Sequence, residues 1–105
     1  MLEIGKHAME RMNEKNITEK MVSIVYQNGA EIKSYNNTKI RYVALKTPFR
    51  KNCVEYRALA VIHCENTKSY GNRFLVTCEW VPENVLYAFE QCRKNHTTYY
   101  SKFAA

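Results

Sequence analysis

Two side chains near the start of the chain, His7 and Arg11, have types and a spacing that suit chemistry on a phosphate diester. An α-helix turns once in about 3.6 residues, so positions i and i+4 lie side by side on one helix face. An imidazole exchanges a proton near neutral pH, and a guanidinium stays charged and holds a phosphate through paired hydrogen bonds. The same spacing is common on solvated helix faces. The pair therefore has two interpretations, a catalytic pair and a polar helix surface.

Metal-free RNA cleavage needs an acid, a base and positive charge or hydrogen-bond donors for the phosphorane. We predict His7 as acid or base and Arg11 as the phosphate clamp. Arg57 and Thr77 lie on predicted strands at positions opposite in parity to the main apolar faces. We therefore expect both side chains to project toward the same exposed cleft, where Thr77 donates its hydroxyl. The alternatives are a surface ion pair for Arg57 and a β-branched strand former for Thr77.

The charge of the chain favours a polyanionic partner. Sixteen lysines and arginines stand against 10 acidic residues, which gives a formal net charge of +6. Such a field attracts nucleic acid first among polyanions. Tyrosines on the predicted strands suit either base stacking or packing within the sheet. The basic residues predicted to bind RNA are Lys33, Arg41, Lys46, Arg50 and Lys51.

Cysteine spacing and hydropathy argue against a zinc-binding, membrane-spanning or secreted protein. The four cysteines include no CxxC pair, whereas zinc sites usually bring two ligands within a few residues. We expect small buried thiols in a reducing compartment, no metal and no cofactor. No apolar run approaches the roughly 20 residues of a membrane span, and the first residues lack the apolar segment of a signal peptide. We expect action in the cytoplasm, with delivery from outside and excision from a larger polypeptide left open.

Hydrophobic periodicity predicts two helices and then a sheet. The first helix is expected from Ile4 to Lys15, and the second follows an N-cap at Thr18 and ends at Asn28-Gly29. The apolar period then changes to that of strands, which are expected at 30–35, 39–46, 54–64 and 73–80.

The connections and the chain end complete the expected fold. Pro48 should end the second strand, a basic loop should occupy 49–52, and polar connections should include Asn36-Asn37 and 65–72. Alternation predicts that one face of the last strand is buried, with Phe74, Val76, Cys78 and Trp80. A helix should follow Pro82 and end near Arg93-Lys94. The prediction is a single α+β domain over 1–105, with two N-terminal helices packed on one face of a four-stranded antiparallel sheet, an added C-terminal helix and a loosely ordered tail at 96–105.

The first residues also resemble a known family. The runs that carry the resemblance are His7-Ala8-Met9-Glu10-Arg11-Met12, Lys15-Asn16-Ile17-Thr18-Glu19 and Asn28-Gly29. They are similar to the opening of a family of small bacterial proteins of unknown function that begin with His-Ala-x-x-Arg-Met. That family has a fold like the RelE and BrnT toxins, within the barnase-, EndoU- and colicin-like ribonucleases. Val76-Thr77 is similar to a strand at which the family often ends, whereas this chain adds a helix and tail from Pro82 onward.

The resemblance implies a RelE-like domain, tRNA or mRNA as substrate, and a small acidic antitoxin or immunity protein as partner. The leading hypothesis is a metal-independent ribonuclease-like toxin domain that acts by general acid-base cleavage. The alternative is a non-catalytic module that binds nucleic acid or protein, as a phage or mobile-element inhibitor does. A third hypothesis is a plain interaction domain.

Overall fold

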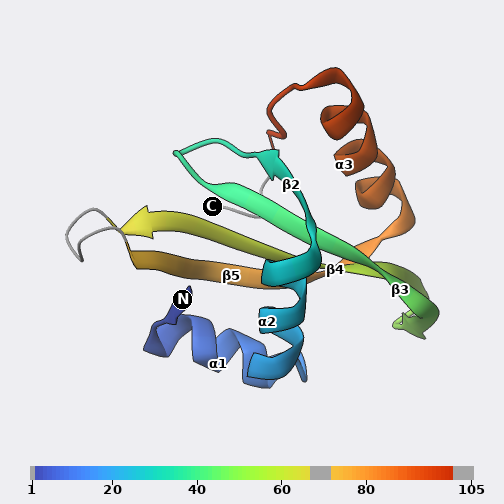
Figure 1. Cartoon of the computed structure of the whole chain (residues 1–105). Helices are drawn as coiled ribbons and strands as arrows, with labels where there is room; N and C mark the ends of the chain where they lie inside the picture. The colour runs from blue at the N-terminus through green and yellow to red at the C-terminus, as the bar shows by residue number, and fades with distance from the viewer. Residues whose placement is uncertain (1, 67–71, 101–105) are drawn as a thin grey trace.

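The computed structural model describes residues 2–66 and 72–100, in which one five-stranded sheet lies between helices (Figure 1). The strands are β1 (Leu2–Ile4), β2 (Ala30–Lys33), β3 (Lys39–Lys51), β4 (Val54–Asn66) and β5 (Asn72–Pro82). The helices are α1 (Lys6–Glu14), α2 (Glu19–Asn28) and α3 (Glu83–Asn95). The predicted α+β class is therefore confirmed, although the sheet and the helix arrangement differ in detail.

The sheet is mixed, so the prediction of four antiparallel strands is wrong. Its order is β1-β5-β4-β3-β2, and β1 pairs in parallel with β5 while the other pairs are antiparallel. β1 was not predicted, and its last residue, Ile4, is where the first helix was expected to begin; that helix begins at Lys6 instead. The change of direction falls at Gly5, where a Cβ would lie 3.2 Å from the ring of Phe74. Glycine allows this close approach of the chain to β5.

The predicted limits of the second helix are confirmed. Thr18 is the N-cap, and its side chain accepts a hydrogen bond of 3.2 Å from the backbone N–H of Met21. Gly29 ends the helix at a place where a Cβ would lie 2.5 Å from the carbonyl oxygen of Val25. The cap and the glycine thus fix where α2 starts and where β2 begins.

β3 continues through Pro48, so the predicted strand end and the loop at 49–52 are wrong. The register of β3 against β4 shifts between Ala44 and Phe49. Such an irregularity accommodates a residue that has no N–H to donate. The actual turn lies at Asn52 and Cys53, which have φ of 53° and 64°. β3 and β4 therefore form a long hairpin.

β4 is buried on both faces and separates two hydrophobic clusters. α1 and α2 cover one face, and α3 covers the opposite face (Figure 1). The two N-terminal helices pack on one face, as predicted, and the added C-terminal helix α3 packs on the other. The cluster on the α1–α2 side contains Ala8, Met12, Ile17, Val22, Val25, Leu59, Val61, Leu75 and Cys78. The cluster on the α3 side contains Ile32, Ile40, Tyr42, Ala58, Ala60, Ile62, Val81 and Phe89.

The expected alternation along β5 is interrupted. Ile62 pairs with Thr77 and His63 pairs with Leu75, so Val76 is an extra residue on β5. As a result Val76 packs on the α3 side, whereas Cys78 is fully buried on the α1–α2 side. Phe74, Val76 and Trp80 are partly exposed, contrary to the prediction of one continuous buried face.

Part of the tail is held against β2. Tyr99 N–H donates a hydrogen bond of 2.8 Å to the carbonyl of Lys33, and Ser34 bridges to Tyr99. The rest of the predicted loose tail, 101–105, and the centre of the predicted connection, 67–71, lie outside the described residues. Within the described ranges, the helices are too short or too polar to cross a bilayer.

Because α3 covers one face of the sheet, we expect its packing to contribute to the free energy of unfolding. Phe89 is fully buried, with ring centroids 5.1 Å from Tyr42 and 4.8 Å from Tyr99, whereas Tyr87 on the same helix is 66% exposed. Phe89→Ala should lower the free energy of unfolding by about 3–5 kcal/mol in urea denaturation. The matched control Tyr87→Ala should change it by less than about 0.5 kcal/mol. Equal losses for the two variants would contradict the packing of α3 on the sheet.

Candidate functional site

The predicted contact between His7 and Arg11 is present on α1. Arg11 Nε donates a hydrogen bond of 3.2 Å to His7 Nε2, on the exposed side of the helix. As an acceptor, Nε2 carries no proton in this geometry, so the bond must open before His7 can take a proton there. Glu10 and Glu14 are exposed on the same helix. Their charges oppose the attraction of a phosphate to this face.

Thr77 does not join this pair. Its side chain is 4% exposed, and Oγ1 has no hydrogen-bond partner. Its cross-strand partner Ile62 belongs to the cluster on the α3 side of the sheet. Because cross-strand partners share a face, Thr77 lies on the face opposite to α1.

Arg57 is also separate from His7. Its guanidinium lies 2.7 Å from Glu55 and 3.9 Å from Glu83, the first residue of α3. Gly5 packs on Phe74 near one end of β5, whereas Glu83 follows the other end. At about 3.3 Å per residue, Gly5 and Glu83 are on the order of 25 Å apart. His7 follows Gly5 closely and Arg57 contacts Glu83, so the two side chains lie near opposite ends of β5. The structure therefore assembles two of the four predicted catalytic residues.

Three predicted RNA-binding cations lie together on the β3–β4 hairpin. Lys46, Arg50 and Lys51 are exposed, and none of them forms an ion pair within residues 2–66 and 72–100. By register, Lys51 pairs with Val54 and shares a face with Phe49, whereas Arg50 lies on the other face. Arg50 is the cross-strand partner of Glu55, so a carboxylate stands opposite this cation, whereas Lys51 has an apolar partner.

A cluster of aromatic rings lies on the face of the hairpin that carries Lys51. The centroid of Phe49 is 5.3 Å from that of Tyr56 and 4.9 Å from that of Trp80. All three side chains are partly exposed. Trp80 Nε1 donates a hydrogen bond of 2.9 Å to the carbonyl of Lys15, which fixes the indole. We call Lys46, Phe49, Arg50, Lys51, Tyr56 and Trp80 the hairpin surface.

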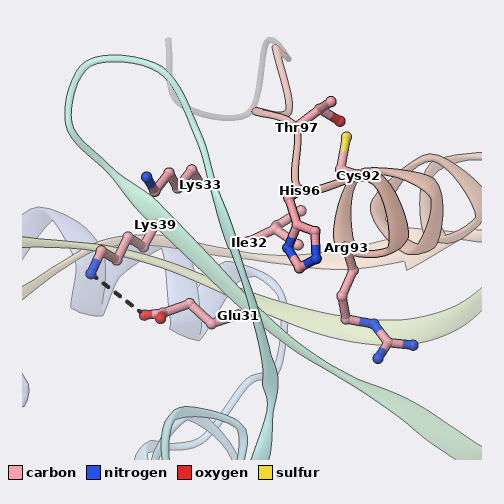
Figure 2. A pocket seen from close by; sticks show the side chains of 8 residues that line it. All are labelled: Glu31, Ile32, Lys33, Lys39, Cys92, Arg93, His96 and Thr97. Atoms are coloured by element: carbon pink, nitrogen blue, oxygen red, sulfur yellow. Dashed lines mark ion pairs between the residues drawn. The ribbon is translucent and has the colours of Figure 1, made fainter.

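The other two predicted RNA-binding residues lie toward the opposite end of β3. Lys33 is exposed and lines a pocket of about 270 Å³ between β2 and the end of α3, together with Lys39, Arg93 and His96 (Figure 2). Glu31 lies in the same pocket, 3.9 Å from Lys39 Nζ. The five cations therefore do not form one continuous surface.

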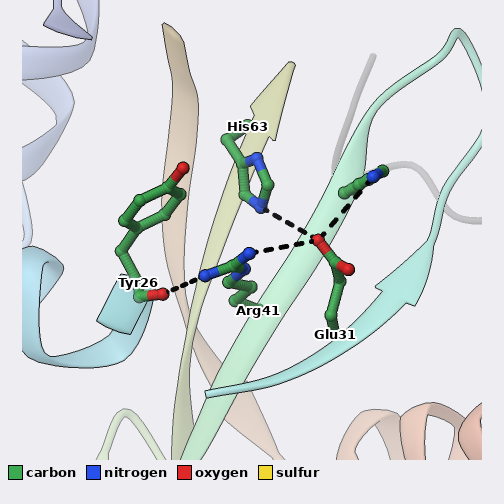
Figure 3. Close-up of polar contacts among 5 residues, drawn as sticks. Tyr26, Glu31, Arg41 and His63 are labelled. Carbon is green, nitrogen blue, oxygen red and sulfur yellow. Dashed lines mark hydrogen bonds and ion pairs between the residues drawn. The ribbon is translucent and has the colours of Figure 1, made fainter. Parts of the chain in front are cut away.

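Arg41 is held inside a polar cluster that the sequence analysis missed (Figure 3). Its guanidinium lies 3.4 Å from Glu31 and stacks over the ring of Tyr26, with its carbon 4.5 Å from the ring centroid. Arg41 also donates a hydrogen bond to the carbonyl of Tyr26. These contacts make Arg41 a structural cation instead of a free RNA ligand.

His63 forms the buried part of the same cluster. It is 1% exposed, meets the ring of Tyr26 edge-on at 5.1 Å, and has Nε2 at 4.0 Å from Glu31. Burial, and after it the charge of Arg41, lower the pKa of His63 to about 4, while Glu31 opposes the shift. The imidazole is therefore neutral at pH 7.

The sequence indicates only one feature of this cluster, the burial of His63. His63 follows Val61 and Ile62 in a strand that is apolar at every position from 58 to 62, and this pattern favours burial at the next position as well. Its contacts with Tyr26, Glu31 and Arg41 join α2, β2, β3 and β4. Local spacing does not reveal contacts of that range.

The cysteines differ in burial. Cys78 is buried, as expected, and burial raises the pKa of its thiol to about 11, whereas Cys53 is exposed. Across the described part of the chain, no three His, Cys, Asp or Glu side chains converge in a way that would hold a metal ion.

Comparison with known proteins finds no matching family model, no matching curated protein and no matching solved structure. The RelE-like fold expected from the first residues therefore remains a prediction.

The buried imidazole makes stability depend on pH. The pKa of His63 falls from 6.5 to about 4 on folding, so the unfolded chain binds more protons between these values. His63 thus contributes stability that is complete above pH 6.5 and is lost as the pH falls toward 4, by up to about 3 kcal/mol. Denaturant titrations of the wild type and of His63→Gln should show this extra acid loss in the wild type alone. Parallel pH profiles would contradict it.

Proposed function

We propose that this protein binds single-stranded RNA through the hairpin surface, without cleaving it there. The observation that carries the proposal is that one hairpin holds both the aromatic cluster and three exposed cations outside ion pairs, Lys46, Arg50 and Lys51. This proposal corresponds to the alternative hypothesis drawn from the sequence, a non-catalytic module that binds nucleic acid. The described part of the chain favours it because Arg57 and Thr77 lie apart from the pair of His7 and Arg11.

Charge supports RNA as the ligand of this surface. Most of the other cations near the sheet have carboxylate partners, such as Lys15 with Glu79 at 2.6 Å and Arg57 with Glu55 at 2.7 Å. A cation without a partner loses no ion pair when it binds a phosphate. The net charge of +6 adds long-range attraction for a polyanion.

The aromatic cluster supports a single strand as the form of the nucleic acid. Unpaired bases expose their ring faces and stack on aromatic side chains, whereas paired bases are already stacked within the duplex. Phe49, Tyr56 and Trp80 are tilted or perpendicular to one another and keep part of their surface exposed. A protein that binds cellular RNA acts in the cytoplasm, which suits its free cysteines.

The salt dependence of binding tests the cations directly. The triple variant Lys46→Gln/Arg50→Gln/Lys51→Gln should reduce the slope of log affinity against log salt by about 2, since each lost phosphate contact on a single strand removes about 0.7. Fluorescence of Trp80, the single tryptophan, reports binding because a base stacked on the cluster quenches it.

The matched control is Lys6→Gln/Lys20→Gln/Lys94→Gln, which removes the same charge from exposed helix positions. This control should lower affinity slightly through net charge and keep most of the slope. If both triple variants change the slope equally, the RNA contacts are spread over the molecule, and the hairpin proposal fails.

The contact between His7 and Arg11 favours a second candidate function, a metal-independent ribonuclease of toxin type. Arg11 Nε lies 3.2 Å from His7 Nε2, so one small displacement brings a proton acceptor and a phosphate clamp to the same substrate. On this proposal the hairpin surface holds the RNA and α1 cleaves it.

This second candidate predicts cleavage that survives chelators and leaves cyclic-phosphate ends. His7→Ala should slow cleavage by about 10² to 10⁴-fold, the usual effect of one positioned acid-base group. Arg11→Lys should also slow it, because an ammonium lacks the planar two-pronged contact. Both residues are outside the core, so thermal midpoints should stay within a few degrees. Intact tRNA and mRNA after incubation with the wild type would exclude this function and leave RNA binding standing.

A further inference from the structure

A second polar pocket, about 110 Å³ in volume, lies at the end of the sheet opposite to the hairpin surface. It is formed where the β2–β3 turn meets the end of β4 and the start of β5. Its lining residues are Asn37, Lys39, His63, Cys64, Glu65 and Arg73. Lys39 is separated from Lys46 by about 20 Å or more along β3, so this pocket is distinct from the hairpin surface.

Strand register places the polar side chains of this pocket on one face. Lys39 is the cross-strand partner of His63, and Arg73 is the partner of Glu65. Residues 63 and 65 share parity on β4, so all four side chains lie on the side of the sheet that α2 covers. Asn37, in the turn with φ of 58°, adds an amide.

His63 forms a buried wall of this pocket. It is 1% exposed, and its Nε2 has no hydrogen-bond partner. In Figure 3 this nitrogen points toward Glu31, whose carboxylate lies 4.0 Å away, beyond hydrogen-bond distance. Glu31 is not among the lining residues of this pocket, so Nε2 is directed at the Glu31–Arg41 cluster, and the imidazole lines the pocket as a buried wall.

The cations around this pocket exceed the carboxylates. Glu31 is shared among Lys39 at 3.9 Å, Arg41 at 3.4 Å and His63. Lys39 is therefore only partly neutralised, and its side chain is 48% exposed. Arg73 hydrogen-bonds to Tyr26, and this bond raises the pKa of Arg73 above its ordinary value. Two lining cations, Lys39 and Arg73, thus stand against one lining carboxylate, Glu65.

We propose that this pocket binds a phosphoryl group. Lys39 and Arg73 supply charge, the Asn37 amide supplies an uncharged donor, and the tetrahedral oxygens of a phosphate match donors that come from several directions. A phosphoryl group reaches this pocket either as free phosphate or as the terminal phosphate of an oligonucleotide.

Inorganic phosphate tests this pocket directly in an amide NMR titration at constant ionic strength. We expect saturable shifts at Asn37, Lys39, Cys64 and Arg73. Arg73→Gln and Lys39→Gln should each weaken binding by roughly tenfold to hundredfold, the effect of one charge-assisted hydrogen bond. Lys20→Gln, an exposed lysine of α2 outside the pocket, should bind phosphate as the wild type does.

To distinguish free phosphate from a terminal phosphate, we compare the binding of two oligonucleotides of the same sequence, one with a 5′-phosphate and one with a 5′-hydroxyl. Tighter binding of the phosphorylated strand, abolished by Arg73→Gln, identifies a terminal phosphate; equal binding of both strands, with saturable inorganic phosphate, identifies free phosphate. The proposal is overturned if phosphate produces no saturable shifts or if Arg73→Gln binds it like the wild type. The hairpin triple variant should keep phosphate binding, so this test and the RNA proposal fail independently.

Discussion

Burial of both faces of β4 is the constraint on which the rest of the structure depends. Residues 58–62 of this strand are at most 3% exposed, with Leu59 and Val61 on one face and Ala58, Ala60 and Ile62 on the other. A strand of this kind needs a layer on each side, since either face left open would expose a continuous apolar surface to water. α1 and α2 supply one layer and α3 the other. The helix after Pro82 is therefore part of the fold, and its packing closes the second face.

Because of this arrangement, the polar and charged side chains of the candidate sites lie toward the ends of the sheet. With both faces covered near its middle, exposed side chains gather at the hairpin tip, around the β2–β3 turn and on the outer side of α1. The hairpin end combines unpaired cations with aromatic rings, whereas the opposite end combines cations, carboxylates and a buried imidazole. The two ends differ in chemistry because the first holds exposed aromatic rings and cations outside ion pairs, whereas the carboxylates Glu31 and Glu65 stand beside the cations of the second. They therefore suit different parts of a polyanion, a flexible chain of bases and a single phosphoryl group.

The elements that local signals specify were predictable, and those that depend on pairing across the sheet were not. Thr18 and Gly29 define α2 because a cap and a stop act within a few residues. β1 was missed because so short a strand is held by its partner β5 and not by its own pattern. The continuation of β3 through Pro48 and the extra residue Val76 depend on register shifts, which alternation in a single strand does not reveal. The contact of His7 with Arg11 followed from helix geometry, whereas the cluster of Tyr26, Glu31, Arg41 and His63 required the assembled sheet.

The central claim is that RNA meets this protein at the hairpin, and amide NMR mapping with a short unstructured RNA tests it most directly. The account predicts that the largest shifts fall within residues 46–56 and at the indole N–H of Trp80, with α1 little affected. Shifts centred on His7 and Arg11, or no shifts at low salt, would contradict it.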